Sequence, residues 1–447
     1  MSPYAQTTWS TLQTQAQNRL DTKGIFYTNA GLYPEITLYL REALRVWNCL
    51  SNHYRERFTF NTTTNLAWYD LHNQVGNPAN LMAKTVLDTD LVAEIQLHLM
   101  ETVSPNIWIG TDMFTLDLVT QALQRRRDQF LLDTGVEQVR TVAALTIPAE
   151  GRFDMPHQVI DIRRLEWVNL AGTRTHLWRT DEWNAQAHNP GSWYLNPLDP
   201  PTQFSTILTH PLGVQLIPPA ALDGQLDRLT VDSGAALNPT VGILMGVPDD
   251  WAWVIKWGAM ADLLGLETQA RDPERAAYCE KRYQEGITLA NLAPIAMFGQ
   301  INGIPVPVIS LHDLDTHRPG WPNETAGIPD VIAVSQYMLA VAPPPNSNTI
   351  SITVDVLRPA PIPATGATFV TLGLEELNAI IDYAHHIGTF KEAGGEFKAT
   401  QRQYDNMVRL AALRNDRLNA AFFREVLEDR AQREETRRPR RTDSGGD

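Results

Sequence analysis

Apolar side chains recur every three or four residues along several parts of the chain, the spacing that places them on one face of a helix. The clearest case begins at Pro34 and includes Ile36, Leu40 and Trp47. Helices are predicted over residues 9–20, 34–50, 90–100, 115–132, 249–264, 273–286, 374–387 and 404–433. Gly135 follows the fourth of these and is the residue expected to cap its C-terminus.

Other parts alternate apolar and polar residues, which is the period of a half-buried strand. Strands are predicted over residues 58–63, 66–71, 139–147, 158–167, 173–180, 212–217, 225–231, 304–311 and 350–356. The strands at 139–147 and 158–167 flank the turn-forming run Pro148–Gly151, so they are expected to pair with each other. Helices and strands in separate blocks predict an α+β fold.

One stretch of the sequence occurs twice, about 126 to 128 residues apart. Each occurrence holds a turn with Pro and Trp, a Pro-rich run, a strand and two helices. The matched pairs are Trp193 with Trp321, Pro201 with Pro329, Trp257 with Tyr383, and Tyr278 with Tyr404, and the two occurrences begin near Pro190 and Pro319. Self-similarity on this scale indicates duplicated domains that share one packing plan. Trp193 and Trp321 occupy matching turns, so both are predicted to be structural wedges.

A weaker repeat lies near the N-terminus, where residues 36–44 line up with residues 114–123. Together the two repeats predict a division of the chain into four segments. These are a helical domain with an internal echo over 1–137, a β-rich module with closing helices over 138–290, a repeat of that module with a long C-terminal helix over 291–433, and a disordered arginine-containing tail over 434–447.

Composition limits the function classes. The chain has 447 residues, of which 43% are hydrophobic and 20% charged, as in an ordinary globular protein with several cores. The net charge of -14 argues against a general nucleic-acid coat, because phosphate binding needs a basic face. It leaves open a protein that surrounds DNA without gripping it. No segment has the apolar length of a membrane span, and the N-terminal residues lack the pattern of a secretory signal.

Motifs of nucleophilic catalysis and nucleotide binding (GxSxG, GxxxxGK[ST], or GxGxxG after a strand) do not occur in the sequence. Cys49 and Cys279 have no CxxC partner and are predicted to be buried thiols. Potential metal ligands gather in one run, His312, Asp313, Asp315 and His317. In a strand-to-turn segment the last three would share a face, but the sequence identifies no supporting ligand elsewhere. Asp382 and His386, one helical turn apart, are interpreted as a solvated helix face. No catalytic, cofactor-binding or metal-binding residue is therefore predicted.

The concentrated basic run of the chain lies at its C-terminus and consists of Arg433, Arg437, Arg438, Arg440 and Arg441. Two interpretations stay open. The run is either a solubilising end or an arm that docks on an acidic partner surface or on nucleic-acid phosphate.

The order of elements resembles a known family. It begins with the helix from Pro34 to Trp47, followed by Phe58-Thr-Phe60 and Trp68-Tyr-Asp-Leu71. It continues with Pro190–Trp193, Gly213–Pro219, Val247–Asp250 and Asp272–Gly286. This order, over residues 9–290, resembles tailed-bacteriophage head-to-tail adaptor proteins, and the layout is similar to that of podophage tail tubular proteins. The chain departs from the short adaptors by its second module, roughly residues 295–425.

The resemblance implies a virion structural protein without enzymatic activity or cofactor. It implies a ring of 12 copies in the virion neck that joins the capsid's portal protein to tail or neck proteins and lines the DNA channel. DNA would pass through without sequence-specific binding, no membrane would be involved, and the protein would be made in the host cytoplasm. Two alternatives remain. One is a tail or baseplate protein that binds host surface carbohydrate through its Trp-rich turns, and the other is a glycan hydrolase, which needs two carboxylates facing one cleft.

Overall fold

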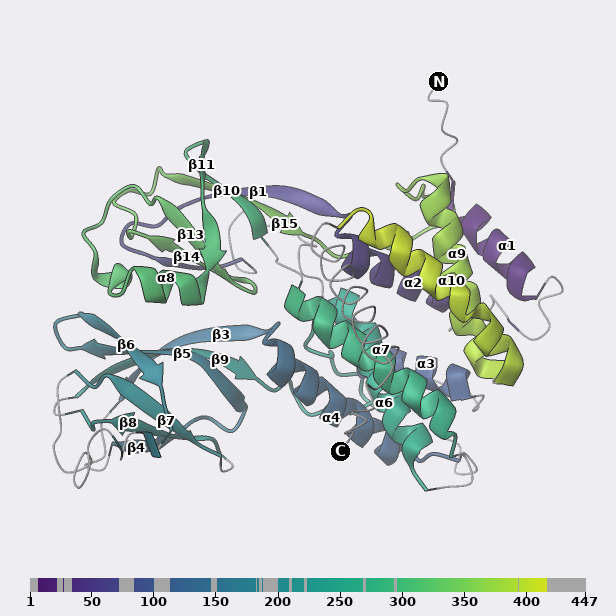
Figure 1. Ribbon diagram of the computed structural model, residues 1–447, viewed down its shortest axis with the longest axis horizontal. Helices are drawn as coiled ribbons and strands as arrows, with labels where there is room; N and C mark the ends of the chain where they lie inside the picture. Colours follow the sequence, from purple (N-terminus) through teal and green to yellow (C-terminus); the bar gives the residue numbers. More distant parts are fainter. Residues whose placement is uncertain are drawn as a thin grey trace, which may run out of the picture. The chain divides into compact units, whose positions relative to one another are not determined.

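The computed structural model has an α+β fold, as predicted (Figure 1). It describes residues 7–21, 27, 34–71, 84–99, 113–145, 151–181, 183–184, 187, 200–208, 211–220, 223–267, 271–292, 296–392 and 394–415.

The chain forms two compact units. The first consists of Met1–His53 with Ala360–Asp447, and the second of Tyr54–Pro359. This division differs from the one expected from the sequence, because the helical domain expected over residues 1–137 is shared between both units. The physical reason is helix packing over a long sequence distance, since the two N-terminal helices bury their apolar faces against helices near residue 400.

The first unit is helical. Its helices are α1 (Trp9–Leu20), α2 (Glu35–Ser51), α9 (Leu374–Thr389) and α10 (Gly394–Ala412), with the short turn η3 (Phe390–Glu392). Helix α9 lies at the centre and packs against each of the other three helices. The Thr8 side chain caps α1, and Asn52 ends α2 in a left-handed conformation. The helix predicted over 404–433 is wrong at both described bounds, because α10 begins ten residues earlier, at Gly394, and ends at Ala412 in a turn. Residues 416–433 lie outside the described residues.

Four helices of the second unit pack together as a bundle. They are α3 (Asp88–Leu99), α4 (Leu116–Thr134), α6 (Ala252–Gly265, after the turn η1, Asp249–Trp251) and α7 (Pro273–Leu292). The Thr115 hydroxyl caps the start of α4, and Gly135 caps its end with φ of 58°, as predicted. Helix α6 is apolar around nearly its whole circumference because its neighbours bury it on several sides.

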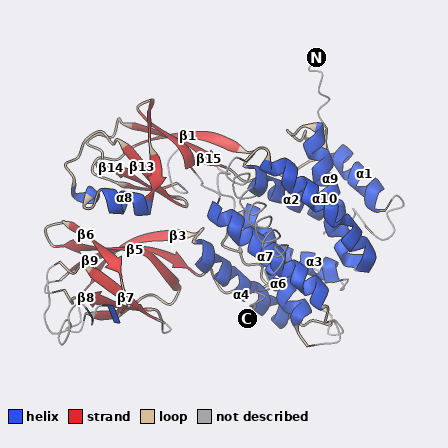
Figure 2. Cartoon of the chain, in the orientation of Figure 1, coloured by secondary structure: helices blue, strands red, loops and turns tan. Residues whose placement is uncertain are grey.

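The strands of the second unit form three sheets, drawn in red in Figure 2. Their bounds are β1 (Arg55–Asn61), β2 (Trp68–Asp70), β3 (Gln138–Leu145), β4 (Arg152–Asp154), β5 (Val159–Asn169), β6 (Arg174–Arg179), β7 (Gln203–Ile207), β8 (Gly213–Ile217), β9 (Gly224–Asp232), β10 (Ala296–Ile301), β11 (Ile304–Val306), β12 (Val308–Ser310), β13 (Val331–Ser335), β14 (Met338–Ala342) and β15 (Ser351–Leu357). The elements outside the sheets are the short helix α8 (Leu311–His317) and the turn η2 (Trp321–Asn323).

The predicted pairing of residues 139–147 with 158–167 is wrong. These segments form β3 and β5, and both pair with β9, which lies between them. Strand β9 is buried along most of its length, which fits a place between two neighbouring strands. In the predicted hairpin, β3 and β5 would have paired directly and left no room for β9 between them. The short strand β4 pairs instead with β8 at the far edge of the sheet.

The same strand order occurs twice. The seven-stranded sheet has the order β3-β9-β5-β6-β7-β8-β4, and the two four-stranded sheets have the orders β1-β15-β10-β11 and β12-β13-β14-β2. Strands β11 and β12 together take the place of β6, because β6 also pairs with β5 through its first half and with β7 through its second. Pro307 interrupts the second version between β11 and β12, since proline has no N–H for a sheet.

The helices follow the same duplication. We call residues 7–71 with 296–415 copy A and residues 84–292 copy B. In each copy, an antiparallel bridge joins the residue before the first helix to a residue before the third helix. The bridge joins Thr8 to Phe369 in copy A and Leu87 to Leu244 in copy B. Copy B is therefore inserted into copy A between β2 and β10.

Aromatic contacts agree with this alignment. Trp257 contacts Tyr278 in copy B with ring centroids 5.6 Å apart, and Tyr383 contacts Tyr404 in copy A at 5.4 Å. These are the pairs matched by sequence, so the two sequence repeats place the same ring pair in each helical bundle.

Candidate functional site

A charged contact joins the strands of copy A to the sheet of copy B within the second unit. Strand β5 alternates, so Leu165 and Trp167 point into the core of the seven-stranded sheet while Arg164 and Glu166 share the opposite face. Helix α8 presents Asp315 to that face. Leu229 of β9 joins Trp68 and Trp321 in the apolar cluster that surrounds the contact.

Arg164 and Asp315 form a buried two-point ion pair. Arg164 Nε donates to Asp315 Oδ2 at 2.8 Å, and its Nη2 donates to Oδ1 at 2.7 Å. Trp321 Nε1 donates to the same Oδ1 at 2.9 Å. Burial works against both charges, but each partner stabilises the other, so the pKa of Arg164 is raised and the pKa of Asp315 is lowered. The two-point geometry fixes the orientation of α8 on the sheet.

The ion pair continues into a network of alternating charge on the sheet. Arg164 Nη1 lies 2.6 Å from Glu166 Oε1, and Arg174 Nη1 donates to Glu166 Oε2 at 3.0 Å. Arg174 and Arg140 both also bind Asp227. The guanidinium groups of three arginines are thus paired with three carboxylates. The pairs are Arg140 with Asp227, Arg164 with Asp315, and Arg174 with Glu166.

Two tryptophans enclose the guanidinium of Arg164. Its central carbon lies 5.3 Å from the ring centre of Trp68 and 5.5 Å from that of Trp321. The two indoles contact each other with centroids 5.6 Å apart. Arg140 approaches the Trp68 ring to 5.5 Å. Apolar rings on a buried cation exclude water and strengthen the ion pair beneath them.

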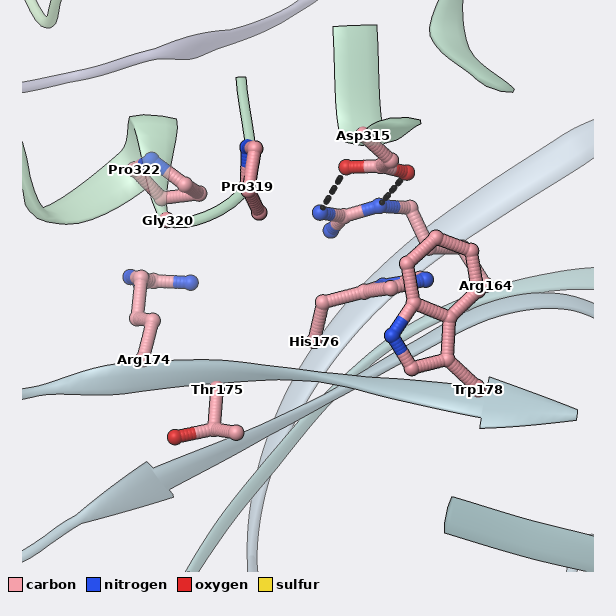
Figure 3. Close-up of a pocket in the computed structure, with 9 residues that line it drawn as sticks. All are labelled: Arg164, Arg174, Thr175, His176, Trp178, Asp315, Pro319, Gly320 and Pro322. Atoms are coloured by element: carbon pink, nitrogen blue, oxygen red, sulfur yellow. Dashed lines mark hydrogen bonds and ion pairs between the residues drawn. The ribbon is translucent and has the colours of Figure 1, made fainter. Parts of the chain in front are cut away.

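A pocket of about 190 Å³ opens beside this contact (Figure 3). Figure 3 shows the two dashed bonds between Arg164 and Asp315, with His176 next to the Arg164 side chain and Trp178 beside His176. The His176 ring meets Trp178 edge-on at 4.5 Å between centroids. Burial and the nearby charge of Arg164 lower the pKa of His176 to about 4, so the imidazole is neutral at pH 7.

The sequence run His312–His317 does not form the strand-to-turn segment that was expected. It is the helix α8, which begins because the Ser310 hydroxyl accepts a hydrogen bond from the backbone N–H of Asp313. Asp313 is exposed and Asp315 buried, so Asp313, Asp315 and His317 do not gather on one face. Across the ranges that the structure describes, no three His, Cys, Asp or Glu side chains lie together as metal ligands would.

The other predicted positions fall in different places. Asp382 forms an ion pair with Arg19, while His386 is fully buried and its Nδ1 lies 2.9 Å from the Thr400 hydroxyl. The expectation of a solvated face is therefore wrong for His386, which contributes to a helix contact. Cys49 and Cys279 are buried thiols, as predicted.

Trp321 is fully buried at the start of η2, where its indole binds Asp315. Its partner in the sequence match, Trp193, lies outside the described residues. So do the five tail arginines, Arg433, Arg437, Arg438, Arg440 and Arg441.

Sequence reasoning missed Arg164 and Glu166. The signal for them was present, because Arg163, Arg164 and Glu166 interrupt the apolar residues of the strand from Ile162 to Val168, and alternation cannot place all three on the exposed face. A charge inside a buried strand is costly unless it is paired, so such positions point to a partner elsewhere in the fold. Asp315 lies 151 residues away from Arg164, which places the partner beyond any local pattern.

Searches against models of known protein families and against curated proteins find no match for this chain. Among the helices described, none combines the length and apolar character needed to cross a membrane.

Proposed function

We propose that this protein is a structural component of a tailed-bacteriophage neck, where a ring of identical chains joins the portal protein to the tail and lines the DNA channel. The proposal starts from the resemblance of its element order to head-to-tail adaptor proteins. It concerns assembly rather than catalysis.

One observation carries the proposal, the nature of the contact between the two copies. Copy A contributes α8, η2 and β2, whereas copy B contributes the outer face of β5, β6 and β9. Two matching folds thus meet through different surfaces. A contact of this head-to-tail type can be repeated from one unit to the next until a ring closes, unlike the self-complementary contact of a simple dimer.

The chemistry of the contact also supports an assembly role. Its arginines and carboxylates neutralise one another, and Trp321 uses its polar atom on Asp315. Such a site holds parts together in one orientation. The net charge of -14 fits a channel that repels DNA phosphates, so that DNA slides past without sticking.

The carbohydrate-binding alternative relied on the Trp-rich turns that hold Trp193 and Trp321. Trp321 is fully buried, so its ring is not accessible for stacking on a sugar.

Electron microscopy of the purified, concentrated protein in negative stain tests the proposal. We expect closed rings with a central opening. Monomers and closed dimers at every concentration, with no rings in the presence of the portal protein from the same virion, would contradict it.

A further inference from the structure

The face of copy B that receives α8 has a counterpart in copy A. In copy B it consists of β3, β9 and β5, and in copy A the matching strands are β1, β15 and β10. The ladders give the register, because Arg140 and Arg164 both lie opposite Leu229, while Arg57 and Phe298 both lie opposite Asp355. Arg57 therefore matches Arg140, and Phe298 matches Arg164.

A bulge supports this register. The pairing with β9 shifts twice in copy B, between Val159 and Asp161 and between Ile162 and Arg164, and the pairing with β15 shifts in copy A between Ala296 and Phe298. The shift at Arg164 is the matching one, because the pairing with the next strand begins at the following residue in both copies, Leu165 in copy B and Gly299 in copy A. An irregularity at the same point of the same ladder re-aims the same side chain in both copies.

The copy A face is accessible where the copy B face is covered. The Arg57 side chain is 60% exposed and Asp355 is 30% exposed, compared with 18% for Arg140 and 4% for its partner Asp227. Arg57 Nε donates to Asp355 Oδ1 at 2.9 Å, and its guanidinium lies 5.7 Å from the Phe298 ring centre. We call Arg57, Phe298 and Asp355 the open face.

Strand β2 of copy A and the neighbouring hairpin β13–β14 have counterparts among the described residues of copy B. Trp68 of β2 lies opposite Ala340 of β14, and Arg152 of β4 lies opposite Gln215 of β8. The hairpins β13–β14 and β7–β8 have the same five-pair ladder, in which Ala340 and Gln215 take the same place. Arg152 therefore matches Trp68.

The hairpin end supports the same match. In copy A, Ser335 at the end of β13 has its Oγ 3.0 Å from Gln138 Oε1 of β3, so this end of the hairpin touches the covered face. Ile207 takes the place of Ser335 in the ladder of copy B, and Leu208 follows it with 88% of its surface exposed. Leu208 therefore lies at the end of the hairpin that corresponds to the docking end in copy A, and its side chain is free to be buried in a contact.

We propose that the open face of one chain binds the Arg152 and Leu208 side of a second copy of this chain, repeating between chains the contact that copy A makes with copy B inside one chain. The association is head-to-tail. It deepens the proposed function by naming the surfaces of the ring, although its argument rests on the duplicated fold.

The contact inside the chain and the proposed contact between chains both pair a cation with an aromatic ring, but the two residue types exchange sides. Inside the chain, the aromatic Trp68 belongs to the docking side and the cation Arg164 to the face. Between chains, the cation Arg152 belongs to the docking side and the aromatic Phe298 to the face. Both combinations place a guanidinium on an aromatic ring. Asp355 adds a carboxylate near Phe298 that attracts Arg152, at the place where copy B has Leu229.

The test measures self-association of the full chain by mass photometry and sedimentation over a concentration series. Phe298→Arg sets two guanidinium groups against each other, and Arg152→Glu sets a carboxylate against Asp355. We expect each change to weaken association roughly tenfold or more. The double variant Phe298→Arg with Arg152→Trp should restore it, because it rebuilds between chains the arrangement of Arg164 and Trp68.

The matched control is Val241→Arg, which places the same new charge at a residue that is 73% exposed in the loop before α6. It should associate like the unchanged protein. Melting curves of all variants separate loss of association from loss of folding. The Arg152 side chain is exposed, so the Arg152→Glu variant should fold like the unchanged protein even if Phe298→Arg perturbs β10.

The outcomes distinguish this interface from the proposed function. Rings that persist in both single variants overturn the interface and leave the neck proposal standing. Open chains or small oligomers that the single variants abolish and the double variant restores support the interface and count against a closed ring. A protein that stays monomeric at every concentration overturns the interface.

Discussion

Replacing Asp315 by alanine tests the structural role of the charged contact most directly. The side chains of Arg164 and Asp315 are 5% and 7% exposed, so the change leaves a buried guanidinium with Glu166 as its remaining carboxylate partner. Breaking a buried ion pair from one side costs about 3–5 kcal/mol. The Trp321 N–H also loses its acceptor, a loss of about 1–3 kcal/mol by itself. The two losses share Asp315 and do not add, so we expect Asp315→Ala to lower the unfolding free energy by about 3–5 kcal/mol.

Matched variants separate the charge from the hydrogen bond. Asp315→Asn keeps an acceptor for Trp321 and should lose less than Asp315→Ala. The double variant Arg164→Met with Asp315→Leu removes both charges and should recover part of the stability lost in Asp315→Ala, because a buried pair is often replaceable by apolar side chains of similar size. The recovery is partial, since the Trp321 N–H still lacks its acceptor and Glu166 keeps only Arg174 as a partner. Arg271→Ala breaks an ion pair with Glu267 whose side chains are 54% and 87% exposed, and it should cause no measurable change.

Urea unfolding of the full chain gives the free energies, and hydrogen exchange in peptides covering β5 and α8 assigns the affected transition to this contact. If Asp315→Ala unfolds like the unchanged protein, or if the double variant is as unstable as Asp315→Ala, the buried pair does not hold the two sheets together as argued.

Three further predictions concern single features. The pKa of His176 is about 4 in the fold and about 6.5 unfolded, so the unfolded chain binds more protons between these values. Stability should fall by up to about 3 kcal/mol as pH drops from 6.5 to 4, and His176→Phe should flatten this part of the stability–pH curve. Gly286→Ala places a methyl group into the Val254 side chain and should cost about 1–3 kcal/mol, whereas Gly265→Ala meets no atom and should not destabilise; thermal unfolding compares them. Deleting 434–447 should leave the melting temperature unchanged and weaken binding to the acidic surface of a portal or neighbouring chain, more strongly at low salt; equal binding by both forms would make the arginines a solubilising end.

Local patterns predicted much of the secondary structure, because helix faces and caps depend on nearby residues. The Gly135 cap of α4 and the apolar stripe of α2 are examples. Strand pairing was not predictable in the same way. Strands β3, β5 and β9 all carry a strand pattern, and the choice of β9 as the centre depends on contacts between residues far apart in the sequence.

The helix α8 was missed for a related reason. Its seven residues are too few for a clear period, and the Ser310 cap that starts it is a single hydroxyl. The nested duplication was visible in the sequence only as two separate repeats with different spacing. The spacing differs because the whole of copy B lies between the first and second segments of copy A, which only the strand order reveals.

Because copy B is inserted into copy A, each helix must pack against helices of its own copy during folding. Two ion pairs between helices favour this correct packing. Arg19 of α1 binds Asp382 of α9 in copy A, whereas in copy B the cation Lys256 is on α6 and its partner Glu94 is on α3, with Nζ and Oε2 2.9 Å apart. The polarity of the contact is reversed between copies. Packing α1 on α6 would bring two cations together, and packing α3 on α9 would bring two carboxylates together. Because α1 must find α9 across the whole inserted copy, we infer that this reversal guides the correct pairing, and exchanging the charges of Lys256 and Glu94 should raise the yield of misfolded chains on refolding.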